Sequence, residues 1–188
     1  MFCWTKFGTE AGEVASSILR RKEWERQSGD GLFLWGIGNA IGPSLEELLG
    51  LTDDPKVVFT PMLSQPAARD VTPSRVAVWR RGRGLDGESF DIPRHARVTS
   101  RVGSGNRPHY ALVCRREAPI THEPSSRSFT ASSVWNLRSG APVGSSQVTS
   151  VVKRAGIDSI ETGARYRVAF IADLVAPYLV RLTEHAVA

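Results

Sequence analysis

The 188-residue sequence has few cysteines, no long apolar run and no pair of metal ligands at a familiar spacing. Cys3 and Cys114 each lie in an apolar stretch with no second Cys or His nearby, which predicts buried, reduced thiols and argues against a zinc site. No apolar run approaches the ~18 residues that span a bilayer, and the N-terminus lacks the apolar region of a signal peptide. We therefore expect a cytoplasmic protein with no membrane contact and no resident metal or cofactor.

The composition is that of a globular protein rather than a fibrous or disordered one. Apolar residues make up 41% and charged residues 23% of the chain, which excludes collagen, coiled coils and disorder. The 17 glycines and 11 prolines predict many turns rather than long helices. We expect one domain over residues 1–188, with long insertions near 82–93 and 118–133.

Positive charge is uneven along the chain. Residues 1–94 carry 12 basic and 13 acidic side chains, whereas residues 95–188 carry 12 basic and 6 acidic ones. A basic half favours a polyanionic partner, because neutralising phosphates supplies most non-specific affinity for nucleic acid. An arginine-rich, solvated surface is an equally good explanation of the same charge.

A first helix is expected over residues 9–25. Thr9 is a good N-cap, and Glu10 and Glu13 would favour the positive first turn. One face carries an apolar stripe at Ala11, Val14, Ala15 and Ile18. Lys22 continues this stripe, so its side chain is expected either to extend to solvent or to point into a cavity.

The rest of the chain is expected to be mostly strands. A short helix over 44–49 follows Pro43 and ends at Gly50. Residues 3–7 are expected to form an edge or entry segment, and strands are expected at 32–35, 56–62, 74–81, 97–101, 109–115, 147–152 and 165–171. This order predicts an α+β fold, a small, partly closed antiparallel β-barrel with an N-terminal helix and a second short helix.

A glycine segment follows the 32–35 strand. Gly36, Gly38 and Gly42 precede a helix, which is the context of a dinucleotide-binding loop. That helix is only about two turns long, and no acidic residue ends a second strand at the usual distance. A tight turn at which the backbone approaches a pocket is the better interpretation.

Two of the five tryptophans are candidates for ligand binding. Trp4 and Trp35 adjoin small or polar segments, which suits rings that form the walls of a pocket for a flat ligand. Stacking on an aromatic ring contributes ~1–3 kcal/mol per base. A single tryptophan is more often part of a core, and Trp24, late in the first helix, is expected to pack there.

Polar residues gather at strand ends. Arg101 is a candidate for gripping phosphate, and His109 for the same basic rim. The side-chain amides of Asn39 and Gln147 can both donate and accept, which suits the edge of a base. Such residues also commonly satisfy backbone groups in buried turns.

Catalytic patterns are weak. The sequence has no G-x-S-x-G turn and no H-E-x-x-H motif. Lys6, Thr9 and Glu10 lie close together at the head of the first helix and would supply a base, a nucleophile and an acid. The same trio also fits a helix cap with a surface charge pair.

Two segments carry a resemblance to a known family. Residues 7–13 (FGTEAGE) opening a helix, followed by residues 32–38 (LFLWGIG), resemble the PUA-like superfamily, particularly its EVE, YTH and ASCH branches. The resemblance implies a small β-barrel around a base-sized pocket. It covers the chain loosely, and only about 35 residues carry its motifs. The two insertions and the C-terminal segment from Gly156 depart from the compact members.

The resemblance implies recognition of a nucleic-acid base, often a modified one, in an aromatic-walled pocket with a basic rim. Trp4 and Trp35 would be the walls and Asn39 the edge reader. Gln147, Arg101 and His109 are added from their positions at strand ends. We therefore expect a binding module rather than an enzyme, with any cleavage supplied by a partner protein.

Two alternatives remain open. Some ASCH-like proteins are small amidohydrolases that act on acylated cytidine with Lys, Thr and Glu in the pocket, and Lys6, Thr9 and Glu10 match those residue types. This alternative requires Lys6 or Glu10 to line a pocket with a perturbed pKa. The other alternative is a ligand-free protein-interaction domain, with residues 174–187 as its docking face.

Overall fold

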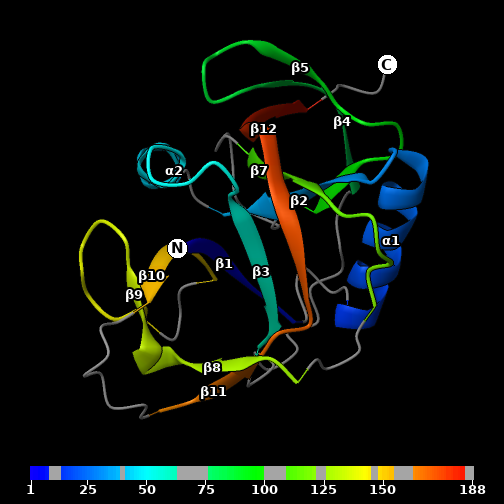
Figure 1. The fold of residues 1–188 in the computed structure, drawn as a ribbon. Helices are drawn as coiled ribbons and strands as arrows, with labels where there is room; N and C mark the ends of the chain where they lie inside the picture. Colours follow the sequence, from blue (N-terminus) through cyan, green and yellow to red (C-terminus); the bar gives the residue numbers. More distant parts are fainter. Residues whose placement is uncertain are drawn as a thin grey trace. The chain divides into compact units, whose positions relative to one another are not determined.

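The structure is a computed structural model that describes residues 1–8, 14–38, 41–62, 76–99, 109–121, 126–144, 148–154 and 163–184. Over these residues the protein is α+β, mostly strands with two α-helices, and most of the strands form a large sheet (Figure 1). No closed barrel is found among the described residues, so the partly closed barrel stays a prediction. The described helices include none that is long and apolar enough to cross a membrane.

The chain divides into two compact units, each built from separate stretches of sequence. Unit 1 comprises residues 1–8, 41–65 and 121–173, and unit 2 comprises residues 9–40, 66–120 and 174–188. Each unit therefore takes residues from both halves of the chain. The expectation of one domain stays a prediction.

Unit 1 is built around strand β1 (Phe2–Phe7). β1 runs parallel to β3 (Lys56–Pro61) and antiparallel to β10 (Thr149–Arg154), which in turn pairs with β9 (Val134–Asn136). A separate two-stranded sheet joins β8 (Ser128–Thr130) to β11 (Arg165–Arg167), and a 3-10 helix (Ala131–Ser133) follows β8. The expectation that residues 3–7 form an edge segment is wrong, because β1 has a partner on each side.

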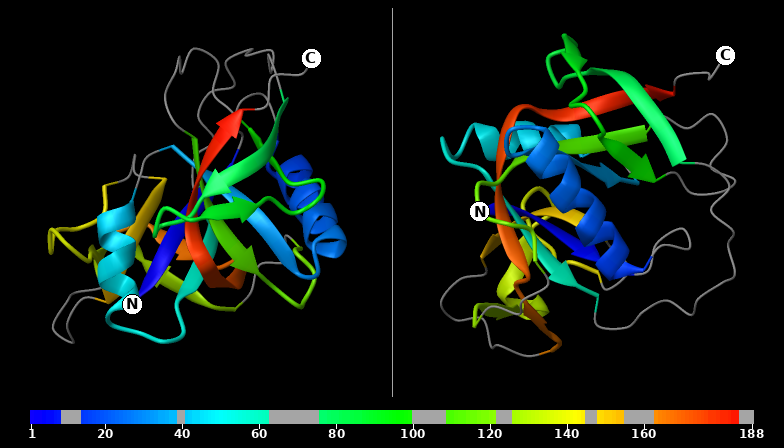
Figure 2. Two further views of the ribbon diagram at one scale, coloured as in Figure 1. Left: turned by 90° about the horizontal axis from the view of Figure 1, so that it is seen from above. Right: turned by 90° about the vertical axis from the view of Figure 1, so that its right-hand side faces the viewer.

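Unit 2 contains helix α1 (Ala15–Ser28) and β2 (Leu32–Ile37), which contact each other. β2 pairs with β7 (His109–Arg115), which lies next to β12 (Phe170–Glu184). β12 also pairs with β4 (Val76–Arg83), and β4 pairs with β5 (Ser89–Asp91) and β6 (Arg97–Thr99). Figure 2 shows the bend of β12, along which Ala176–Pro177 is a cis peptide and Tyr178 has a positive φ of 64°.

The helix predictions are confirmed in part. Helix α2 (Gly42–Leu49) has a proline in its first turn and ends at Gly50, as expected. Helix α1 begins six residues later than the predicted N-cap, at Ala15 instead of Thr9, and ends at Ser28. Val14 is half exposed and not part of a buried stripe; α1 instead buries Ile18, Leu19, Lys22 and Glu25. The predicted stripe is thus confirmed at Ile18 and wrong at Val14, which is the N-cap rather than a helical residue, and Ala11 lies outside the described residues.

Most of the expected strands are present with shifted ends. β7 spans the predicted residues, whereas the predicted 165–171 strand divides into β11 and the start of β12. Strands β5 and β8 lie inside the predicted insertions. The expected docking face over 174–187 is wrong for its described part, because β12 pairs with neighbouring strands and buries Leu174, Leu179, Val180 and Leu182.

Candidate nucleic-acid interface

The structure describes four of the predicted site residues. Trp4 and Lys6 lie on β1 in unit 1, whereas Trp35 on β2 and His109 at the start of β7 lie in unit 2. The other five lie outside the described residues, namely Thr9, Glu10, Asn39, Arg101 and Gln147. Within unit 1, the structure brings Trp4 and Lys6 together.

Trp4 is the centre of a buried aromatic cluster in unit 1. Its ring meets Phe129 and Tyr166 edge-on, with centroids 5.1 and 4.8 Å apart. Its indole nitrogen donates a hydrogen bond of 2.9 Å to Thr60 Oγ1. The two-stranded β8–β11 sheet supplies both ring partners, because Phe129 and Tyr166 are opposite each other in its register. The Trp4 ring is 1% exposed, so it offers no open surface for stacking.

Lys6 is buried against the same rings. Its Nζ lies 4.6 Å from the centroid of the Trp4 ring and 5.3 Å from that of Tyr166, both within cation–π range. It also donates a long hydrogen bond, 3.4 Å, to the carbonyl oxygen of Gly144. Burial of the ammonium lowers the pKa of Lys6 below its ordinary value. A lysine that loses its proton more readily is a better nucleophile or base.

Trp35 and Gly36 have packing roles in unit 2. Trp35 is 6% exposed on β2, and His109 is half-buried. A Cβ on Gly36 would lie 2.6 Å from Cγ1 of Val98, so this position needs glycine to let β6 approach β2. That Trp4 and Trp35 form the walls of one pocket therefore stays a prediction. Neither ring is exposed.

The most exposed tryptophan among the described residues is Trp24 on α1. Its side chain is 43% exposed, and its ring lies against His95 with centroids 4.6 Å apart and planes 32° apart. The guanidinium carbon of Arg97 lies 5.9 Å from the Trp24 centroid. We call Trp24, His95 and Arg97 the stacking platform. The expectation that Trp24 packs in the core is wrong, because Trp24 lies outside the inner face of α1, which includes its sequence neighbours Lys22 and Glu25.

A buried ion pair holds the stacking platform in place. Glu25 is fully buried and accepts hydrogen bonds from Lys22 Nζ at 2.8 and 2.9 Å and from the backbone N–H of Arg97 at 3.0 Å. Lys22 Nζ and Arg21 each donate to the carbonyl oxygen of Arg97 at 2.8 Å. Both backbone polar groups of Arg97 are thus fixed by α1. Lys22 neither extends to solvent nor points into a cavity.

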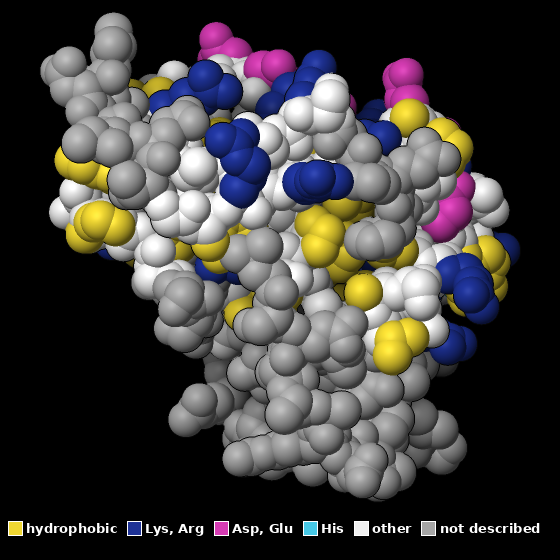
Figure 3. Space-filling model, turned by 90° about the horizontal axis from the view of Figure 1, so that it is seen from below, with side chains coloured by type: hydrophobic (Ala, Val, Ile, Leu, Met, Phe, Trp, Pro, Cys, Tyr) yellow, Lys and Arg dark blue, Asp and Glu magenta, His cyan; other side chains and the backbone are white. Residues whose placement is uncertain are grey.

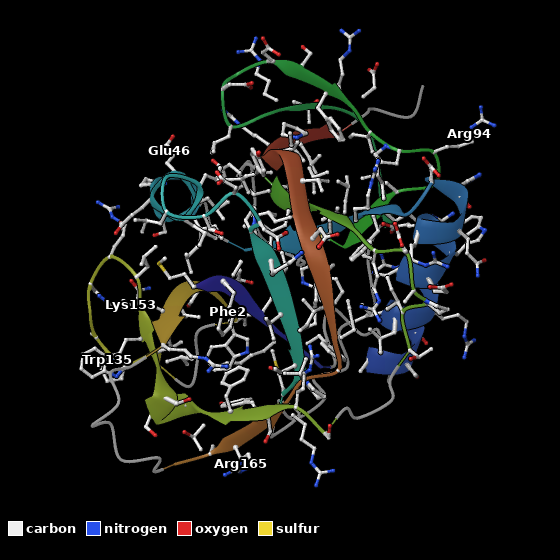
Figure 4. The ribbon with its side chains drawn as sticks, in the orientation of Figure 1. Phe2, Glu46, Arg94, Trp135, Lys153 and Arg165 are labelled. Carbon is white, nitrogen blue, oxygen red and sulfur yellow. The ribbon has the colours of Figure 1, made fainter. Side chains whose placement is uncertain are left out.

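The backbone at His95 is unusual. His95 has a φ of 68°, a left-handed conformation that is uncommon for a residue other than glycine. Strained backbone of this kind is found more often at functional sites than elsewhere. Arg94, next to it, points outward beside α1 (Figure 4) and is exposed, as is Arg20, one turn before Trp24 on α1.

Basic side chains alone do not mark a single site. Figure 3 shows Lys and Arg at several separate places on one face, with apolar and uncharged side chains between them. Within the described ranges, no group of three or more His, Cys, Asp or Glu lies together as metal ligands. Both cysteines are buried, as expected, and burial raises the pKa of Cys3 to about 12, so its thiol stays protonated.

Comparison with known proteins adds no assignment. No protein-family model matches the chain, and neither a curated protein nor a solved structure does.

Proposed function

We propose that the protein is a nucleic-acid-binding module in which an unpaired base stacks on Trp24. The observation that supports this most directly is the exposed indole of Trp24, which has a histidine ring and an arginine beside it. Proteins that bind single strands combine an exposed aromatic ring with nearby cations, because every base has a face that can stack. The PUA-like resemblance and the preference for a modified base belong to this proposal.

The charge around Trp24 supports the same function. Arg20, Arg94 and Arg97 are all exposed, and each carries a positive charge at any physiological pH. A base on the Trp24 ring would place its own phosphate within reach of such side chains. An arginine guanidinium can donate two parallel hydrogen bonds to a phosphate. The protein would therefore bind both the base and its phosphate.

Fluorescence anisotropy with labelled single-stranded and duplex oligonucleotides, plain and base-modified, tests the proposal at two salt concentrations. Trp24→Ala is expected to weaken single-strand binding roughly five- to 150-fold, because stacking contributes ~1–3 kcal/mol per base. The matched control is Trp135→Ala, which removes the exposed tryptophan of β9 in unit 1 and should leave binding unchanged. Equal effects of the two substitutions, or no binding by the intact protein, would contradict the proposal.

Lys6 supports a second candidate function, hydrolysis of an acylated nucleoside. Its amine is buried beside two aromatic rings and has a lowered pKa, which is the environment that activates a lysine. Incubation with N-acylated cytidine, followed by chromatography, measures this activity. Lys6→Met should abolish turnover, and Lys153→Met, on β10 of the same unit, should not. Absence of turnover by the intact protein would exclude this candidate.

A further inference from the structure

Three arginines of unit 2 stand on one face of a sheet. In the register, Arg83 of β4 is opposite Arg181 of β12, and Arg81 is opposite Thr183. The residues between them, Gly82 and Leu182, are paired and buried on the other face, where Leu182 joins the hydrophobic cluster of Leu34 and Val113. Side chains alternate between the faces of a strand, so the arginines point outward, and all three are exposed. We call Arg81, Arg83 and Arg181 the arginine ladder.

The charge of the arginine ladder is not neutralised by ion pairs within the part of the chain that the structure describes. Asp91 of β5 is opposite Arg81 in the register, yet the two side chains form no salt bridge. Arg83 and Arg181 are directly opposite each other, and like charges at that position destabilise a sheet. Such an arrangement favours an anion from outside the protein that bridges the two guanidinium groups.

The arginine ladder and the stacking platform lie along the same strand. Arg97 of the platform pairs with Val78 of β4, three positions before Arg81. At about 3.3 Å per residue, this separation is about 10 Å along β4. A nucleic-acid strand rises 3.4 Å per nucleotide in B-form geometry and more when it is extended, so two or three nucleotides cover the distance.

We propose that the arginine ladder binds successive phosphates of the strand whose base stacks on Trp24. This inference rests on the proposed function and adds the path that the sugar-phosphate backbone of the nucleic acid takes over the protein. A phosphate between Arg83 and Arg181 would relieve their mutual repulsion and accept hydrogen bonds from both guanidinium groups. The complete site is then an aromatic surface at one end of β4 and a phosphate-binding surface at the other.

The test measures affinity for oligothymidylates of two, four, six and eight nucleotides. Affinity should rise sharply between two and six nucleotides, when the strand becomes long enough to reach the arginine ladder. The double variant Arg83→Gln/Arg181→Gln should bind the octamer at least tenfold more weakly and bind the dinucleotide as the intact protein does. The slope of log K against log salt should also become shallower by about 0.7, since Arg83 and Arg181 share one phosphate and each single-strand phosphate contact contributes about 0.7.

The matched control is Arg138→Gln/Arg167→Gln, which removes two exposed arginines of unit 1. If this control lowers octamer affinity as much as the ladder variant, the arginines act only through net charge and the inference fails. If short oligonucleotides bind through Trp24 but affinity does not rise with length, the proposed role of the arginine ladder is wrong and the proposed function stands. If no oligonucleotide binds at any length, both are wrong.

Discussion

Each unit of the protein buries a lysine, and the two units accommodate the charge in different ways. In unit 2, Lys22 is 3% exposed and donates to both oxygens of a buried carboxylate, that of Glu25. In unit 1, Lys6 is 5% exposed and lies over the faces of Trp4 and Tyr166. Burial lowers the pKa of both lysines, but for Lys22 the negative charge of Glu25 opposes that shift.

The two lysines therefore differ in the partners that the structure describes. Lys22 has a buried carboxylate, whereas Lys6 has two ring faces and the carbonyl oxygen of Gly144. Glu25 also accepts the backbone N–H groups of Leu34 and Arg97, so the Lys22 pair is tied into the strands that surround α1. A ring face attracts an ammonium but offers no proton acceptor of comparable strength. We therefore expect unit 2 to depend on its buried lysine for stability and unit 1 to depend on it much less.

The largest expected effect comes from Lys22→Met. This substitution keeps the side-chain volume but leaves the fully buried Glu25 carboxylate without its closest cation. Breaking a buried pair from one side costs about 3–5 kcal/mol, so we expect a loss of about 3 kcal/mol in the free energy of unfolding, measured with urea. The control is Lys56→Met, whose bridges to Asp54 and Asp173 are exposed, and it should cost less than about 1 kcal/mol.

A smaller loss in the free energy of unfolding is expected from Thr60→Val in the aromatic cluster of unit 1. Valine matches threonine in shape but cannot accept the hydrogen bond from Trp4 Nε1, which is buried. An unpaired buried donor costs about 1–3 kcal/mol. Thr60→Ser, which keeps the hydroxyl, should restore most of the lost stability, and equal losses in the two variants would show that packing rather than the hydrogen bond matters.

Lys6→Met is expected to change the free energy of unfolding by less than about 1 kcal/mol at neutral pH. The lost cation–π attraction is offset by removing the cost of burying the ammonium, and methionine fills the same space. Chemical denaturation of Lys6→Met and Lys22→Met under the same conditions compares the two losses of stability directly. A loss as large as that of Lys22→Met would remove the distinction between the two lysines.

The smallest expected effect is the pH dependence that Lys6 contributes. Its pKa is lowered in the folded protein, so between that value and the ordinary lysine value of 10.5 the unfolded chain binds more protons than the folded one. Stability should therefore rise with pH through this window relative to Lys6→Met. Unfolding curves at pH 7 to 10.5 for both proteins measure the difference, and a flat difference would contradict the lowered pKa.

Local sequence signals predicted the short elements well and the inner face of α1 poorly. Pro43 and Gly50 bracket α2 because proline and glycine constrain the backbone wherever they occur. By contrast, an apolar stripe cannot reveal that Lys22 and Glu25 face inward, because each is buried only in the presence of the other. The exposure of Trp24 follows from the same pair, so the stacking platform was missed in the sequence.

The prediction of the site was limited by long-range contacts. Trp4 and Lys6 are two residues apart on one strand, and their nearness to each other follows from alternation alone. Their neighbours Thr60, Phe129 and Tyr166 come from three distant segments, and no local pattern predicts that these rings close over Trp4. The arginine ladder likewise exists only through the register of β4 with β12.

The sequence by itself determined the class of the protein: an α+β chain rich in turns, with buried cysteines, a short second helix and most of its strands. These follow from local conformational preferences and from side-chain alternation, which act over a few residues. Only the tertiary structure decided that the Lys22–Glu25 pair is buried, which tryptophan faces solvent and which arginines share a sheet face. Those outcomes depend on pairing between segments up to a hundred residues apart, where the burial of one group is stable only because another group is already there.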